Sequence, residues 1–213
     1  ITKANIKNFL AGKTSLNRFM SYNIMFSSGV WLNNKAFNLK EYCLNIQKRD
    51  KGRVVSNRGG YQSSPVDTKD PILQPFISYI EEQANQFNKE VWKCLTIFEI
   101  DNMWVNINNK GDSNIAHLHP RTHFSGVYYV DKPKDSGDIF FDRPDTDLIS
   151  TYYSGMSYGS LTNANSESWF FKCRNDDLII FPAFYKHRVE PSRSNKQRIS
   201  ISFNLSSNLK TYT

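Results

Sequence analysis

The chain has 213 residues, a length that suits one well-cored domain better than two small ones, so we expect a single domain over residues 1–213. Hydrophobic residues make up 39% and aromatic residues 14% of the sequence, which excludes an intrinsically disordered chain. The net charge of +7 comes from scattered basic residues, so it indicates a solvated basic surface more strongly than a nucleic-acid-binding one.

Two segments in the first part of the chain have helical periodicity. From about Pro75 to Trp92, apolar residues recur at intervals of one, three and four, which places them on one helix face. Pro75 suits the first turn of that helix. A weaker helix is expected from Asn38 to Arg49, with Asn38 as its N-cap.

A polar segment that contains two glycines, Ser56 to Pro65, lies between these helices. Its composition is typical of a loop that is neither strand nor helix for long. Loops of this length in compact domains often cover a site. The sequence leaves open whether this one is a lid or a plain connector.

From Cys94 onward apolar residues tend to recur at every second position, and β-branched and aromatic residues dominate. The expected strands are Leu95 to Asn108, Ile115 to His119, Phe124 to Asp131, Asp138 to Asp142, Thr151 to Ser157, Ser168 to Lys172, Leu178 to Pro182, His187 to Glu190 and Arg198 to Asn204. This order predicts an α+β, mainly β fold: a jelly roll of residues 94–205, with helices and loops of residues 1–93 packed outside one sheet.

Three of the four histidines lie between His117 and His123. On a strand, residues two apart project to the same face, so His117 and His119 can direct two imidazoles at one point. Pro120 then ends the strand, which suits a site at the mouth of a barrel.

The fourth histidine, His187, follows the apolar run Leu178 to Phe181 and could complete a three-ligand face from a neighbouring strand. Imidazole suits iron, copper, nickel and zinc, and three protein ligands leave positions open for substrate and oxygen. A lone His-x-His pair is more often structural than metal-binding, so these spacings alone decide neither the site nor the metal.

Strict alternation from Arg198 to Asn204 separates a polar face from an apolar one. The fork of Arg198 can pair with a carboxylate, and the hydroxyl of Ser200 can donate to the same group. The same alternation is typical of a strand with one face in solvent.

Taken together, these residues resemble the 2-oxoglutarate/iron(II) dioxygenase superfamily, whose pattern is His-x-Asp/Glu, a distant His, and then a basic residue, often Arg. Arg198-Ile199-Ser200 is similar to the anchor for the far carboxylate of 2-oxoglutarate in that superfamily. A closer likeness is to a small group of oxygenases from bacteria and from tailed phages of marine bacteria. The segments that carry it are Ser56 to Ser63, Trp104 to Asn106, His117 to Pro120, Ser125 to Val130, Ser136-Gly137 and Arg198 to Asn204.

The resemblance implies a double-stranded β-helix and the cofactors Fe(II) and 2-oxoglutarate. His117, His119 and His187 would be the metal ligands and catalytic residues. Arg198, Ser200 and Tyr129 would bind 2-oxoglutarate, and Trp104, Asn106 and Asn114 are candidates for the pocket wall. O2 and an unidentified substrate would react with release of succinate and CO2, and hydroxylation is the expected outcome.

One departure from the superfamily pattern concerns His119, which stands where the superfamily has a carboxylate ligand. Either three histidines coordinate the metal, which we favour, or His119 contacts the ligands without coordinating the metal and water takes its place. A third arrangement would use His123, but Pro120 interrupts the alternation that would keep it on the same face.

Two other functions remain compatible with the residues. A cupin-like three-histidine dioxygenase would share the histidines without needing Arg198, and a non-enzymatic jelly-roll binding or virion module would need neither. The substrate class is open among a nucleic acid, an acidic protein and a small metabolite. The three widely spaced cysteines and the absence of an apolar signal core favour the cytoplasm, that of the host if a phage encodes the chain.

Overall fold

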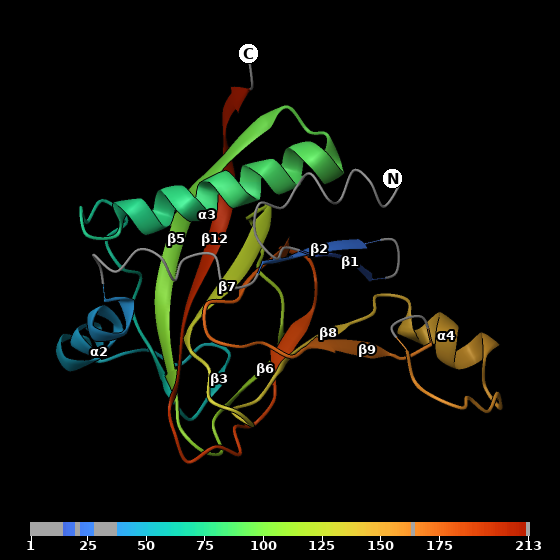
Figure 1. Cartoon of the computed structure of the whole chain (residues 1–213). Coiled ribbons are helices and arrows are strands. Elements are labelled where there is room, and N and C mark those ends of the chain that lie inside the picture. Colours follow the sequence, from blue (N-terminus) through green and yellow to red (C-terminus); the bar gives the residue numbers. More distant parts are fainter. Residues whose placement is uncertain (1–14, 20–21, 28–37, 163–164, 212–213) are drawn as a thin grey trace.

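The computed structural model describes residues 15–19, 22–27, 38–162 and 165–211, which form two antiparallel sheets (Figure 1). One sheet runs in the order β1 (Ser15–Phe19), β2 (Tyr22–Ser27), β10 (Leu178–Pro182), β7 (Phe124–Asp131), β12 (Arg198–Thr211), β5 (Thr96–Asn108) and β4 (Tyr61–Gln62). The other runs in the order β3 (Asn57–Arg58), β6 (Ser113–His117), β11 (His187–Val189), β8 (Ile139–Asp142) and β9 (Ser168–Phe171). This arrangement confirms the expected fold, which is mainly β and built as a jelly roll.

Both expected helices are present and lie against the seven-stranded sheet (Figure 1). Asn38 caps α2 (Leu39–Arg49) by accepting the N–H of Glu41, and α3 (Gln74–Phe87) starts with Pro75 in its first turn and continues as a π-helical turn, η1 (Asn88–Trp92). Their buried faces share one apolar core with the outer face of the sheet.

The inner face of that sheet meets the five-stranded sheet around a second core, which includes Val127, Ile139 and Phe181. Because residues of β12 alternate, Ile199 and Ile201 pack under the helices while Arg198 and Ser200 point between the sheets. The polar face of this strand therefore lines the interior of the sandwich rather than facing solvent.

Three parts of the sequence-based expectation were wrong or incomplete. Thr151 to Ser157 is not a strand; the segment overlaps the end of a short helix, α4 (Thr146–Tyr152), and the turn after it. The first 93 residues also contribute strands, because β2 pairs with β10 and so extends the seven-stranded sheet. Strand β6 ends at His117, so His119 lies in the loop that follows it.

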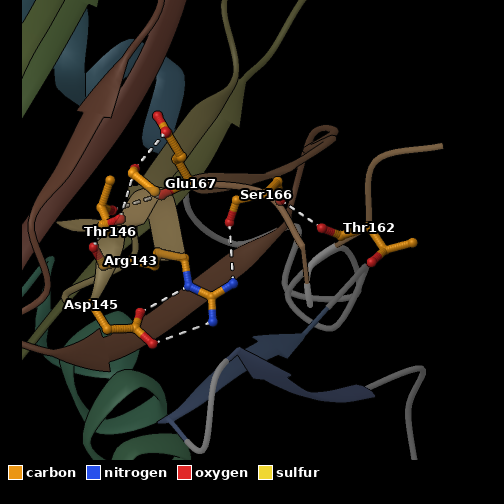
Figure 2. A network of polar contacts seen from close by, with 7 residues as sticks. Arg143, Asp145, Thr146, Thr162, Ser166 and Glu167 are labelled. Atoms are coloured by element: carbon orange, nitrogen blue, oxygen red, sulfur yellow. Dashed lines mark hydrogen bonds and ion pairs between the residues drawn. The ribbon is translucent and has the colours of Figure 1, made fainter. Parts of the chain in front are cut away.

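The segment that contains α4 projects beside β9, at the edge of the five-stranded sheet (Figure 1). Arg143 anchors its start by donating to both carboxylate oxygens of Asp145, at 2.8 and 3.4 Å, and to the carbonyl of Ser166 (Figure 2). The aromatic residues that suggested a strand, such as Tyr152, which is 78% exposed, have no partner strand among the described residues. Local hydrogen bonds set the structure of this segment instead.

The segment Ser56 to Pro65 joins the two sheets at one end of the sandwich. β3 pairs with β6 in one sheet and β4 pairs with β5 in the other. Gly59 and Gly60, with φ of +65° and +67°, form the turn between them, a conformation that favours glycine. The segment is therefore paired into both sheets.

Gly126 on β7 leaves room for the ring of Phe203. A Cβ atom on Gly126 would meet Phe203 Cζ at 2.3 Å and the backbone oxygen of Ile179 at 2.6 Å. Because that backbone oxygen is held in the sheet, we expect Gly126→Ala to lower the free energy of unfolding by about 3 kcal/mol in urea denaturation. Gly159→Ala, where a Cβ atom meets nothing within 4 Å, is the matched control. Equal losses in the two variants would contradict this close packing.

Among the residues that the structure describes, no helix has the length and apolar character needed to cross a bilayer.

Candidate metal centre and cosubstrate pocket

Three histidines converge at the mouth of the sandwich. His117 ends β6 and His187 begins β11, and the two are direct partners across these strands. His119 is positioned by its backbone N–H, which donates to the carbonyl of Ala183 at 3.0 Å. The potential ligand nitrogens of the three side chains all lie within 4.8 Å of one another. The structure therefore brings together the three residues that the sequence singled out.

His123, the remaining histidine, lies elsewhere. Its ring packs against Phe98, with a centroid distance of 5.4 Å, and its Nδ1 accepts the backbone N–H of Ser207. It lines neither the cavity that all three of the other histidines share nor the one that only His117 and His119 share. The arrangement that would use His123 as a ligand therefore has no support in the geometry.

Backbone carbonyls fix the orientation of two of the three rings. Nδ1 of His117 lies 2.7 Å from the oxygen of Ile115, and Nδ1 of His187 lies 2.8 Å from the oxygen of Tyr185. Since a carbonyl oxygen only accepts, each Nδ1 carries the hydrogen and each Nε2 keeps a free lone pair, as in metal-binding histidines.

The third ring completes the face. Nε2 of His119 lies 3.4 Å from Nε2 of His187, close to the separation of about 3 Å that two imidazole nitrogens have when they share an ion. The indole of Trp104 stacks on His119 with a centroid distance of 5.8 Å and holds the plane of this ring. Three converging imidazoles, two of them with a free Nε2 lone pair, fit a divalent transition metal such as Fe(II).

Burial keeps these imidazoles neutral, which is the form that binds a metal. Desolvation lowers the pKa of His187 well below its ordinary value and that of His119 to about 4, and it lowers the pKa of His117 as well. Each of the three can therefore accept an ion at neutral pH without first losing a proton.

The same pKa shifts predict how the metal-free protein responds to acid. Below a pH of about 6.5 the unfolded chain binds protons at these histidines and the folded protein does not, so the free energy of unfolding falls as the pH falls. For His119 the fall continues towards its folded pKa of about 4, by at most about 1.4 kcal/mol per pH unit. Urea denaturation of metal-free wild type and His119→Asn between pH 7.5 and 5 measures this contribution. Parallel pH profiles for the two proteins would contradict it.

A cavity runs inward from the histidines between the two sheets. Arg198 and Ser200 of β12 and Tyr129 of β7 line its inner part, and Trp104, Asn106 and Asn114 also contribute to the wall, as expected. No acidic residue of the described chain lines this cavity. Its fixed charge is therefore that of Arg198.

Arg198 is only 2% exposed, and its Nη1 donates to the carbonyl oxygens of Ser136 and Gly137. Among the described residues, no carboxylate lies within ion-pairing distance of its guanidinium. A buried guanidinium without a directly paired carboxylate is costly, so the geometry favours an anion bound beside it.

Two hydroxyl groups lie next to this guanidinium on neighbouring strands. Ser200 and Tyr129 are direct partners across β12 and β7, and both are buried. Burial raises the pKa of Tyr129 well above its ordinary value, so its hydroxyl stays protonated and can donate. Arg198, Ser200 and Tyr129 together offer donors suited to a carboxylate.

Asn108 belongs to the same wall and was missed from the sequence. It is 2% exposed and lines the cavity beside Arg198, its direct partner on the neighbouring strand. Its Oδ1 has no hydrogen-bond partner within the described structure, so a ligand or water can supply one. The alternation Trp104, Asn106, Asn108 was the signal that could have identified it.

Comparison with known proteins agrees with this geometry. A family model described as "Putative 2OG-Fe(II) oxygenase" matches residues 102–204, which include all three histidines and Arg198. No curated protein matches the chain. The nearer likeness to oxygenases of bacteria and phages is not addressed by this match and stays a prediction.

Solved structures with the same fold include a prolyl-4-hydroxylase from Pseudomonas putida, with a TM-score of 0.58, 13% identity and coverage of 95% of this chain and 97% of that one. The α-ketoglutarate-dependent epimerase SnoN of nogalamycin biosynthesis has a TM-score of 0.66, 12% identity and coverage of 96% and 82%. HygX from Streptomyces hygroscopicus, with nickel and 2-oxoglutarate bound, has a TM-score of 0.56, 10% identity and coverage of 99% and 89%. At these identities the likeness shows the fold.

The family match covers the strands that carry the site, and the fold extends over nearly the whole chain. The protein is therefore an oxidoreductase with the cofactors Fe(II) and 2-oxoglutarate. On this evidence residues 102–204, just under half of the chain, match a 2-oxoglutarate/iron(II) oxygenase family, and solved oxygenases share the fold of nearly the whole chain.

Proposed function

We propose that this protein is a dioxygenase that hydroxylates a substrate not yet identified and converts 2-oxoglutarate and O2 to succinate and CO2. His117, His119 and His187 would hold Fe(II), and Arg198, Ser200 and Tyr129 would hold 2-oxoglutarate. The observation that carries this proposal is the buried guanidinium of Arg198, which has no carboxylate partner in the described chain and shares a cavity with the histidines.

The bound iron would supply oxygen activation coupled to oxidative decarboxylation of 2-oxoglutarate. The chain supplies position and exclusion of water. Carbonyl oxygens of Ser136 and Gly137 hold the guanidinium of Arg198 in place, so its remaining donors can pair with the far carboxylate of 2-oxoglutarate. The hydroxyls of Tyr129 and Ser200 can donate to the same carboxylate.

His119 takes the place of the carboxylate ligand in this proposal. Its Nε2 faces that of His187, and no acidic residue of the described chain lines the cavity to serve instead. A face of three neutral imidazoles carries one negative charge fewer than the superfamily pattern. This should make the bound iron more electrophilic.

A visible spectrum recorded without oxygen tests the proposal. Adding Fe(II) and 2-oxoglutarate to the purified protein should produce a weak metal-to-ligand charge-transfer band that requires both additions. Iron binding without such a band would favour a three-histidine dioxygenase that does not use 2-oxoglutarate. Failure to bind iron at all would favour a binding module.

A further inference from the structure

A second cavity of about 400 Å³ opens onto the metal centre from outside. We call it the mouth groove. It shares Ser56, Trp104, His117 and His119 with the inner cavity, so whatever occupies it lies next to the histidines. Its volume is in the range of pockets that hold small ligands. A substrate that approaches the metal from solvent would occupy this groove.

One side of the mouth groove is apolar and exposed. Val55, Ile115 and Leu118 line it and are 57%, 43% and 50% exposed, respectively. Exposed apolar side chains that gather beside a cavity mark a surface that contacts a ligand or partner. The substrate should therefore have an apolar part.

Apart from its two histidines, the mouth groove has one basic residue among the described residues that line it. Arg53 lines it, and no acidic residue of the described segments does. The guanidinium of Arg53 makes no ion pair with any described carboxylate. Its backbone N–H donates to the carbonyl of Gln62 at 2.8 Å, which fixes this residue beside β4.

Gln62 adds a second observation on the same side. Its side chain lines the mouth groove and is 4% exposed, and its Oε1 has no hydrogen-bond partner among the described residues. A buried acceptor of this kind calls for a donor from a ligand or water. The mouth groove thus has an apolar wall, one cation and, at Gln62, a buried acceptor without a described partner.

We propose that the mouth groove selects a small substrate that carries one anionic group, a carboxylate or a phosphate, on an apolar body, with Arg53 as the specificity-determining residue. This inference rests on the proposed dioxygenase function, since it names the substrate class of the same centre. A single arginine beside an apolar wall suits a small acid better than a nucleic acid, whose backbone requires several cations.

Two related fluorescent probes test the charge preference. 1-Anilinonaphthalene-8-sulfonate is an anion on an aromatic body, and N-phenyl-1-naphthylamine has the same body without the charge. We expect Arg53→Gln to weaken binding of the sulfonate about tenfold and to leave binding of the neutral probe unchanged. Leu118→Gln should weaken both probes, since it removes part of the apolar wall without disturbing a buried residue.

Arg58→Gln is the matched control, because Arg58 is a nearby exposed arginine that lines neither cavity. Equal sulfonate affinity in wild type and Arg53→Gln would overturn the proposal. So would equal weakening by Arg58→Gln, or displacement of the sulfonate by a micromolar single-stranded oligonucleotide, which would favour a nucleic-acid substrate.

Probe binding requires no iron in this proposal, so the two proposals fail separately. If no charge-transfer band appears but sulfonate binding depends on Arg53, the dioxygenase function is overturned and the anion-selective groove remains. A normal band with Arg53-independent probe binding would overturn the substrate class alone.

Discussion

Replacing Arg198 with methionine should reduce the affinity for 2-oxoglutarate at least about 30-fold while changing the stability of the ligand-free protein little. Removing one partner of a buried, hydrogen-bonded charge pair costs about 2–5 kcal/mol of binding free energy. In the ligand-free protein the variant loses the hydrogen bonds to Ser136 and Gly137 but also the cost of an unpaired buried charge. These two effects oppose each other, so we expect a change in unfolding free energy below about 2 kcal/mol.

Titration of the charge-transfer band with 2-oxoglutarate measures the first effect, and urea denaturation of the ligand-free protein measures the second. Arg188→Gln is the control, because Arg188 pairs with Asp142 on the five-stranded sheet and does not line the inner cavity. Its affinity for 2-oxoglutarate should equal that of the wild type. An Arg198→Met protein that folds normally and still binds 2-oxoglutarate tightly would remove the basis for the cosubstrate site.

Local patterns predicted much of the fold. The bounds expected for β7 and β10 agree with the structure, as does the whole segment that forms α3 and η1. These elements have one strongly apolar side, and that is the signal that sequence periodicity detects. Elements that depend on distant partners were missed, such as β2, which is a strand because it pairs with β10.

The candidate site shows the same limit. Alternation along β12 separated Arg198 and Ser200 from Ile199, but it could not say which face was interior. Helix packing on the Ile199 side decides this, because it turns the polar face towards the second sheet. His187 likewise reaches His117 through pairing of β11 with β6, a contact between strands about 70 residues apart that no local spacing encodes.

His119 decides whether the metal has a three-histidine face. If His119 is a ligand, His119→Ala should weaken Fe(II) binding at least about 100-fold, and His187→Ala should do the same. Removing a residue that only hydrogen-bonds to a ligand typically lowers metal affinity about 10- to 100-fold, and removing a ligand itself should lower it further. His119→Asp should restore binding to within about tenfold, since a carboxylate can occupy the same position.

Anaerobic titration against a chromophoric iron chelator measures these affinities, and His123→Ala is the control, because His123 is exposed and lines neither cavity. If His119→Ala binds Fe(II) as tightly as the wild type while His187→Ala does not, water fills the third position and His119 does not coordinate the metal. The stacking of Trp104 on His119 argues against that result, because a ring held beside the Nε2 of His187 already has the position of a ligand.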